Sequence, residues 1–373
     1  MAGASLSSSL SQVLVAFAIE FDNEFERQLQ RTYARPVLTS IVMWSNVMRY
    51  VHEDGVALDE LARQGRVATK ALASVVGGLE RWGYLSVDHD PRDGFGSQRP
   101  GFGSARGLKP ASVLFPSMTG ELTQRLWAPL ADEVEQRWTE RLGGEAVENL
   151  RGALAPVLER VGMLMPRFLP VVSGKGLFAA PMVDLGEGEM DGESDLPTLL
   201  ARVLLAFALE YERDAAVSLP IAANVLRVVT PEPVGVDDLP AAAGVSKEAV
   251  STSLTWLSRQ SLVAVEPKSS GRGKVASLTA AGNDAQAEHM RRLSAVEQAW
   301  AARFGTHAVE SMRSALDSLL THEAFTAALV TPENGWRGRG RYKHLTKRFI
   351  DRPTEALPRY PMILHRGGWP DGS

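Results

Sequence analysis

Two groups of small polar and basic side chains stand near the starts of two predicted helices. Hydroxyl and cationic groups in that place can reach the base edges and phosphate oxygens of nucleic acid, while apolar positions hold the helix to its domain. The first group contains Arg66, Thr69, Lys70 and Ser74, and the second contains Ser246, Lys247, Ser251 and Thr252. We predict that both groups contact DNA; the alternative is a solvated helix face without a nucleic-acid partner.

Two glycine-rich segments follow these helices and carry further cations. In the first, the heptad GFGSQRP is directly followed by GFGSARG, and the second reads KSSGRGK. Glycine lets such loops extend and cations suit phosphate contact, although a flexible solubilising loop has the same composition. The candidate contacts are Arg92, Arg99 and Arg106 in the first segment, and Arg272 and Lys274 in the second.

No catalytic motif accompanies these groups in the sequence. The chain has no HExxH, no GxSxG and no phosphate-binding loop, and the pair His322 and Glu323 lacks a second metal ligand. The absence of cysteine excludes disulfides, thiolate nucleophiles and cysteine metal sites together. We therefore expect no enzyme activity, no metal site and no cofactor.

The two candidate helices occupy equivalent places in a long internal repeat. The sequence ATKALASVVGGLERWGYLSV at 68–87 aligns without a gap with SKEAVSTSLTWLSRQSLVAV at 246–265. The blocks VLVAFAIEF and VLLAFALEY, NVMR and NVLR, and VEQRW and VEQAW recur in the same order. The period is the length of a whole domain rather than that of a solenoid unit. The repeat therefore predicts one fold duplicated within the chain.

Apolar spacing predicts the same order of elements in both repeats: two helices, a helix-turn-helix, a wing and two long helices. In the first repeat, helices are expected over 10–33, 37–51, 58–63 and 67–82, strands over 84–87 and 113–115, and helices over 121–142 and 145–161. In the second, helices are expected over 237–242 and 246–260, strands over 262–265 and 275–278, and helices over 283–304 and 308–320. The predicted fold class is mainly α with small β-wings, in tandem winged helix-turn-helix domains that form a single-chain pseudo-dimer.

Changes of composition place the domain boundaries. The first repeat and the first nine residues of a following hook, MPRFLPVVSGKG, occupy 1–173, and a linker rich in glycine, proline and acid occupies 174–197. The second repeat occupies 198–322, and a basic tail with the related hook LPRYPMILHRGG occupies 323–373. The most basic stretch, 336–348, is typical of an arm that binds nucleic acid and equally of a tail pinned by glutamates.

The motifs GVSKEAVSTSLTWLSRQSLV, the wing that follows and LTAAG resemble those of the MarR family of bacterial winged-helix regulators. The resemblance covers about 10–161 and 199–320. In that family the first and last helices form a two-fold dimer that holds two recognition helices about one DNA turn apart, ~34 Å. The resemblance implies the same arrangement within this single chain, with Arg272 in the place of the family's wing arginine.

In the MarR family, aromatic effectors bind between the dimer helices and the winged helix. The resemblance therefore implies a pocket for a small aromatic or apolar effector, lined by Phe17, Glu20, Trp44, Tyr50, Trp127 and Trp138. Aromatic side chains at helical spacing are more often core residues than pocket residues. The carboxylates of Glu20 and its equivalent Glu210 need partners, for which Arg49 and Arg227 on the next helices are candidates.

Charge and hydropathy limit the partners. The formal net charge of -4 gives no global attraction to nucleic acid, so DNA contact must come from local basic patches. No apolar run approaches the roughly 18 to 20 residues of a membrane span, and the Ser-rich start lacks the basic region of a signal peptide. We expect a cytoplasmic protein without a membrane partner.

These observations predict a transcriptional regulator that binds double-stranded DNA as a covalent pseudo-dimer. Because the two copies differ in recognition helix and wing, the preferred site is expected to be an imperfect inverted repeat. The chain would act as a monomer in this form, with a higher oligomer left open. The competing hypothesis is a degenerate winged-helix scaffold that binds or transforms a small molecule, or binds a partner protein, without binding DNA.

Overall fold

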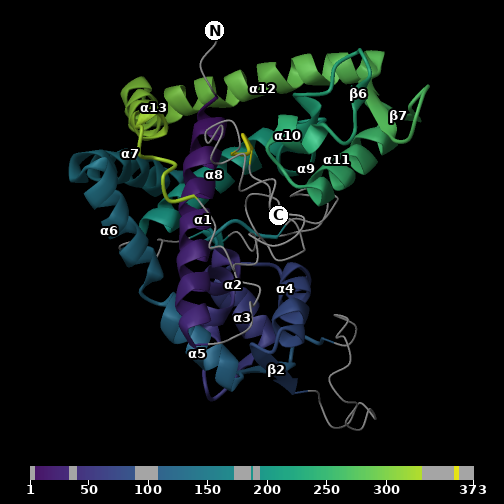
Figure 1. Cartoon of the computed structure of the whole chain (residues 1–373). Coiled ribbons are helices and arrows are strands. Elements are labelled where there is room, and N and C mark those ends of the chain that lie inside the picture. Colours follow the sequence, from purple (N-terminus) through teal and green to yellow (C-terminus); the bar gives the residue numbers. More distant parts are fainter. Residues whose placement is uncertain are drawn as a thin grey trace.

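The computed structural model describes residues 5–32, 40–88, 108–171, 186–187, 194–329 and 357–360. This part of the chain is mainly helical and carries small antiparallel sheets, as Figure 1 shows. The mainly α class with small β elements is thereby confirmed. The predicted contacts Arg92, Arg99 and Arg106 and the basic stretch 336–348 lie outside the described residues.

Among the described residues, the first half contains eight helical segments and a small sheet. The helices are α1 (Leu6–Thr32), α2 (Ile41–Asn46), the 3-10 turn η1 (Met48–Tyr50), α3 (Leu58–Gly65), α4 (Thr69–Arg81), α5 (Met118–Trp127), α6 (Leu130–Leu142) and α7 (Gly144–Val161). The strands β1 (Val56–Ala57), β2 (Leu85–Asp88) and β3 (Val113–Pro116) pair antiparallel in the order β1-β3-β2.

The second half repeats this order of elements. Its helices are α8 (Leu196–Glu212), α9 (Leu219–Leu226), α10 (Leu239–Ala243), α11 (Lys247–Arg259), α12 (Ala280–Phe304) and α13 (Thr306–Thr321). Its strands β6 (Val234–Gly235), β7 (Val263–Pro267) and β8 (Lys274–Leu278) pair antiparallel in the order β6-β8-β7. A separate pair, β4 (Met163–Leu164) with β5 (Gly186–Glu187), brings part of the predicted linker onto the end of the first half.

Two predicted helices differ from the structure by an interruption or an early end, whereas the other predicted helices differ from it by a few residues at their ends. The helix expected over 121–142 is interrupted, because Pro129 lacks an N–H group and its ring clashes with the preceding turn, so that α5 ends before it and α6 begins after it. The equivalent α12 contains no proline and runs unbroken. The helix expected over 37–51 is described from Ile41 onward and ends at Asn46, where η1 takes over.

The first and last helices of the two halves pack against each other in a shared core. The long helix α1 is buried along most of its length and runs through the middle of the molecule in Figure 1. It packs against α8 and α13, while α7 packs against α13 and α8. The apolar stripes of these helices therefore find their partners in the opposite half of the chain.

Equivalent polar contacts tie the halves together across this core. Glu135 and Arg151 form an ion pair between α6 and α7, and Arg151 Nη1 donates to a backbone carbonyl just before α8 at 3.1 Å. Glu297 and Arg313 form the matching pair between α12 and α13 at 2.7 Å, and Leu6 N at the start of α1 donates to Glu297 at 2.6 Å. Each half thus holds the first helix of the other, as in a two-fold isologous contact.

A short hook follows each half and is held by an asparagine. Asn46 Nδ2 donates to Phe168 O at 3.1 Å, and its Oδ1 accepts from Phe168 N at 3.0 Å. In the second half, Asn224 Nδ2 donates to Tyr360 O at 3.2 Å. Its Oδ1 accepts from the N–H groups of Arg359 and Tyr360 at 3.1 and 3.2 Å. The side chains that sequence places in matching positions therefore perform the same structural task.

Replacing Asn224 with Ala is expected to lower the free energy of unfolding by about 2 kcal/mol or more, because buried backbone groups of the hook lose their partners. Chemical denaturation measures this change. A suitable control is Asn283→Ala, since Asn283 lies exposed at the start of α12 and should change stability by no more than about 0.5 kcal/mol. Equal losses in both variants would contradict the proposed role of Asn224.

Candidate nucleic-acid interface

Local sequence fixes helix α11 on the second half and leaves one of its faces free. Gly244 ends α10 in the left-handed conformation (φ 76), which lets the chain turn sharply into α11. Ser246 accepts a hydrogen bond from Ala249 N at 3.1 Å and so caps the helix. On the inner side, Leu257 is fully buried and Ser253 donates to Ile221 O in α9. The opposite side of α11 is therefore available for contact.

This free side of α11 lines a groove of about 480 Å³ together with the residues that follow β6, with α10 and with the strands β7 and β8. Lys247, Ser251 and Lys274, three of the sequence-predicted contacts, lie on the groove, and all three are exposed. Arg259 adds a further cation, and Asp237 is the acidic residue among the lining groups. The cationic side chains and the hydroxyl of Ser251 could together contact phosphate oxygens and base edges.

The remaining predicted contacts of the second half lie around this groove or beneath it. Arg272 is exposed in the turn between β7 and β8, where Gly271 and Gly273 have positive φ values of 81 and 118. Thr252 is half-buried on α11. Ser246 is only 2 % exposed and its hydroxyl caps the helix, so the prediction that its side chain contacts DNA is corrected.

The matching helix of the first half, α4, is built differently. Arg66 ends α3 with a positive φ of 54, in the place that Gly244 takes in the second half, and it is half-buried. Ala68 precedes α4 and offers no side-chain cap, and Thr69, the first residue of the helix, is half-buried. Lys70 and Ser74 lie on α4, but their side chains are outside the described part of the structure.

The carboxylate of the predicted effector pocket is already paired. Glu20 Oε2 accepts from Trp138 Nε1 at 2.8 Å, and Arg141 donates to both oxygens of Glu20 at 3.2 and 2.7 Å. Phe17 meets the Trp138 ring edge to face, with ring centroids 5.2 Å apart. The expected pairing of Glu20 with Arg49 is therefore wrong, because Arg141 on α6 lies closer in space than the arginine of the next helix in sequence.

The other aromatic residues of that pocket also make core contacts. Trp127 is fully buried and stacks on Phe25 at 4.7 Å and on Trp44 at 6.1 Å. Arg49 lies over the Trp44 ring at 5.1 Å, and burial lowers the pKa of its guanidinium. Tyr50 is half-buried against the same core. The structure thus brings these side chains together as packing, which is the competing interpretation that sequence left open.

Sequence reasoning missed a buried polar chain in the second half. Tyr211 Oη and His289 Nδ1 are 2.7 Å apart, and His289 Nε2 lies 3.1 Å from Tyr360 Oη. Burial lowers the pKa of His289 to about 4, so the imidazole is neutral at pH 7. A neutral ring has one donor and one acceptor nitrogen, so one tyrosine hydroxyl donates to it and the other accepts from it.

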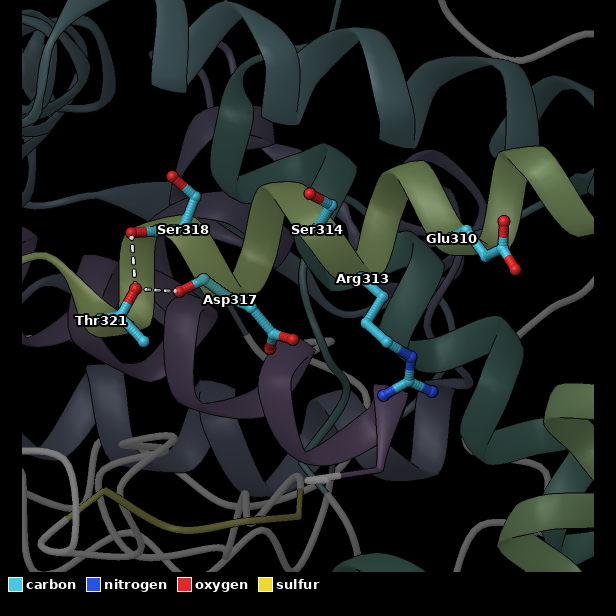
Figure 2. A pocket seen from close by; sticks show the side chains of 6 residues that line it. All are labelled: Glu310, Arg313, Ser314, Asp317, Ser318 and Thr321. Carbon is cyan, nitrogen blue, oxygen red and sulfur yellow. Dashed lines mark hydrogen bonds between the residues drawn. The ribbon is translucent and has the colours of Figure 1, made fainter. Parts of the chain in front are cut away.

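A shallow polar groove of about 550 Å³ runs along α13 and is shown in Figure 2. Three of its six polar lining residues have side chains with partners. Arg313 pairs with Glu297 at 2.7 Å, Ser9 donates to Asp317 at 3.4 Å, and Thr321 Oγ1 donates to Asp317 O at 2.7 Å. This groove therefore borders the contact between α13 and α1.

Comparison of the sequence and the structure with known proteins finds no relative of this chain. No helix in the described part of the chain is long and apolar enough to cross a membrane. No family model matches the sequence, and no curated protein and no solved structure is detectably similar to it.

Proposed function

We propose that the chain is a cytoplasmic transcriptional regulator that binds double-stranded DNA through two winged-helix domains duplicated within one polypeptide. The observation that carries this proposal is the groove of α11, where Lys247, Ser251 and Lys274 lie exposed beside a β-hairpin. Exposed cations and hydroxyl groups on a helix and its neighbouring wing suit phosphate and base contact.

The correspondence between the halves supports the duplication. Both halves follow the order of two helices, a helix-turn-helix, a three-stranded sheet and the closing helices. In each, the residue after the sheet caps the next helix: Ser117 accepts from Gly120 N at 3.0 Å, and Thr279 accepts from Gly282 N at 3.0 Å. Identical local devices at matching positions are expected of one domain used twice.

The unequal helices α4 and α11 support an imperfect inverted repeat as the preferred DNA site. Helix α11 has a serine cap and begins with Lys247, whereas α4 follows Ala68, which offers no side-chain cap, and begins with Thr69 and Lys70. Side chains at the start of a helix in the major groove read different bases when their types differ. A pseudo-dimer with two such helices would favour two related but unequal half-sites.

The Lys247→Ala and Arg272→Ala variants are expected to weaken binding to a duplex selected from random sequence. If each cation neutralises one phosphate, each change lowers the slope of log affinity against log salt by roughly one unit. Ser251→Ala should instead change the sequence preference. The control is Arg291→Ala, because Arg291 is exposed on α12 and pairs with Glu288 outside the groove.

Fluorescence anisotropy at several stated salt concentrations measures these effects. A wild-type chain that shows no salt-sensitive binding to any duplex at low ionic strength would contradict the proposal.

The competing function is a winged-helix scaffold that binds a small molecule without binding DNA. A single observation favours it, namely the cavity beside Glu210.

A further inference from the structure

A cavity of about 230 Å³ lies where the end of the first half meets the second half. Met163 of β4 contributes from the first half, and α8 contributes Glu210 and Arg213. Helix α12 contributes Trp300, Arg303 and Phe304. Trp300 and Phe304 are buried, Glu210 is half-buried, and both arginines are exposed. The cavity therefore has an aromatic floor and a charged rim.

The equivalent place in the first half is closed. There Arg141 and Trp138 both donate to Glu20, and the ring of Phe325 from the second half covers Trp138 at 5.7 Å between centroids. Met163 and Phe325 stand at the same sequence distance after the matched Arg151 and Arg313. The flexible, unbranched side chain of Met163 thus takes the place of the phenyl ring where the cavity opens.

The arginine that would close the second cavity is turned away. Glu210 Oε2 accepts from Trp300 Nε1 at 2.9 Å, as the first half leads one to expect. Arg303, the equivalent of Arg141, donates instead to the carbonyl oxygens of Arg160 and Val161, both at 3.3 Å. Its guanidinium also lies 4.9 Å from the centre of the Phe304 ring. The other carboxylate oxygen of Glu210, Oε1, therefore forms no hydrogen bond with any described residue.

The cavity offers three complementary kinds of group to a ligand. Glu210 Oε1 can accept from an ammonium group. Arg213 forms no hydrogen bond or ion pair with the described residues, and it can pair with a carboxylate, as can the free nitrogens of Arg303. The rings of Trp300 and Phe304 suit an apolar side chain. Ammonium, carboxylate and apolar side chain are joined on one carbon in a free α-amino acid.

We propose that this cavity binds one free α-amino acid with an apolar side chain. Its volume lies below the roughly 300–1,000 Å³ of pockets for drug-sized ligands, which favours a single small molecule. The ligand would contact α8 and α12 of the second half and the end of the first half at the same time. The inference concerns ligand binding alone and stands whether or not the chain binds DNA.

Isothermal titration of the full chain with three probes tests the proposal. L-phenylalanine carries all three groups, 3-phenylpropionate lacks the ammonium and 2-phenylethylamine lacks the carboxylate. A charged hydrogen bond lost from a binding site corresponds to a decrease in affinity of about 10-fold or more. We expect saturable 1:1 binding of L-phenylalanine and at least about 10-fold weaker binding of the other two probes. Equal binding of 3-phenylpropionate would overturn the amino-acid assignment.

Three variants locate the site. Glu210→Gln retains an acceptor for Trp300 and should weaken L-phenylalanine binding about 10-fold without weakening that of 3-phenylpropionate. Arg213 lies at the exposed rim, and the Arg213→Gln variant should bind both carboxylate probes, L-phenylalanine and 3-phenylpropionate, more weakly. Met163→Phe restores the residue type of the closed site and should abolish binding with an unchanged thermal midpoint. The control is Arg291→Gln on the exposed face of α12. Wild-type affinity in Arg213→Gln, or no saturable binding of L-phenylalanine to the wild-type chain, would overturn the proposal.

Discussion

Replacing Gly282 with Ala is expected to lower the free energy of unfolding by about 3 kcal/mol or more. A Cβ atom at this position would lie 2.0 Å from the carbonyl oxygen of Leu262, and the obstacle is backbone rather than a flexible side chain. That carbonyl already accepts from Thr279 N at 3.1 Å and from Thr279 Oγ1 at 3.2 Å. Relief of the clash therefore requires a shift of the helix start against the strand, which breaks these bonds.

The matched variants are Gly120→Ala and Gly152→Ala. Gly120 occupies the equivalent place in the first half, where a Cβ would lie 1.9 Å from Tyr84 O, so a similar loss is expected. Gly152 lies in α7 with open space around it, and alanine there should stabilise the helix by about 0.5–1 kcal/mol. Chemical denaturation distinguishes these outcomes when the slope of unfolding free energy against denaturant concentration is the same for all variants. Losses of similar size in all three variants would show that the close approach is not their cause.

Structure that depends on neighbours in sequence could be predicted from the sequence. The cap at Thr279 and the glycine at 282 belong to a single short motif, and both halves contain it. Asn46 and Asn224 also match in sequence, and so do the hooks that they hold. The core packing of the first and last helices follows from their apolar stripes, since such stripes need partners.

Partner choice between distant segments could not be predicted in the same way. The sequence offers Arg49 as the partner of Glu20, but the packing of α6 on α1 brings Arg141 to it. Whether an aromatic residue such as Trp127 lines a pocket or fills the core depends on every helix around it, and it is fully buried. The cavity beside Glu210 depends on where Arg303 turns, which no local pattern encodes.

The buried chain of Tyr211, His289 and Tyr360 has a signal in sequence that pairwise comparison of the halves reveals. The positions equivalent to these three residues are Phe21, Trp127 and Phe168 in the first half. Phe21 and Phe168, which form no side-chain hydrogen bonds, are replaced by tyrosines, and Trp127, whose indole N–H has no hydrogen-bond partner among the described residues, is replaced by histidine. A coordinated change of this kind indicates that the side chains meet in space, because an isolated polar group in that core would lack a partner.

Protonation of His289 is expected to make the protein less stable in acid. Burial lowers the pKa of His289 from the usual 6.5 to about 4, so the unfolded chain binds a proton that the folded chain excludes. Above about pH 6.5 the histidine is neutral in both the folded and the unfolded chain, so the folded state is not destabilised by its protonation. This contribution is lost as the pH falls from 6.5 to about 4 and amounts in total to about 3 kcal/mol.

The His289→Gln variant should lose this part of the pH dependence. Glutamine does not titrate and retains a donor and an acceptor for the two tyrosine hydroxyls, so the stability difference from wild type should narrow as the pH falls from 7.5 to 4.5. Free energies of unfolding from urea denaturation at several pH values measure the two curves. His307→Gln, at an exposed position of α13, is the control and should follow the wild-type curve. Parallel curves of unfolding free energy against pH for wild type and His289→Gln would mean that burial does not lower the pKa of His289, and would contradict this prediction.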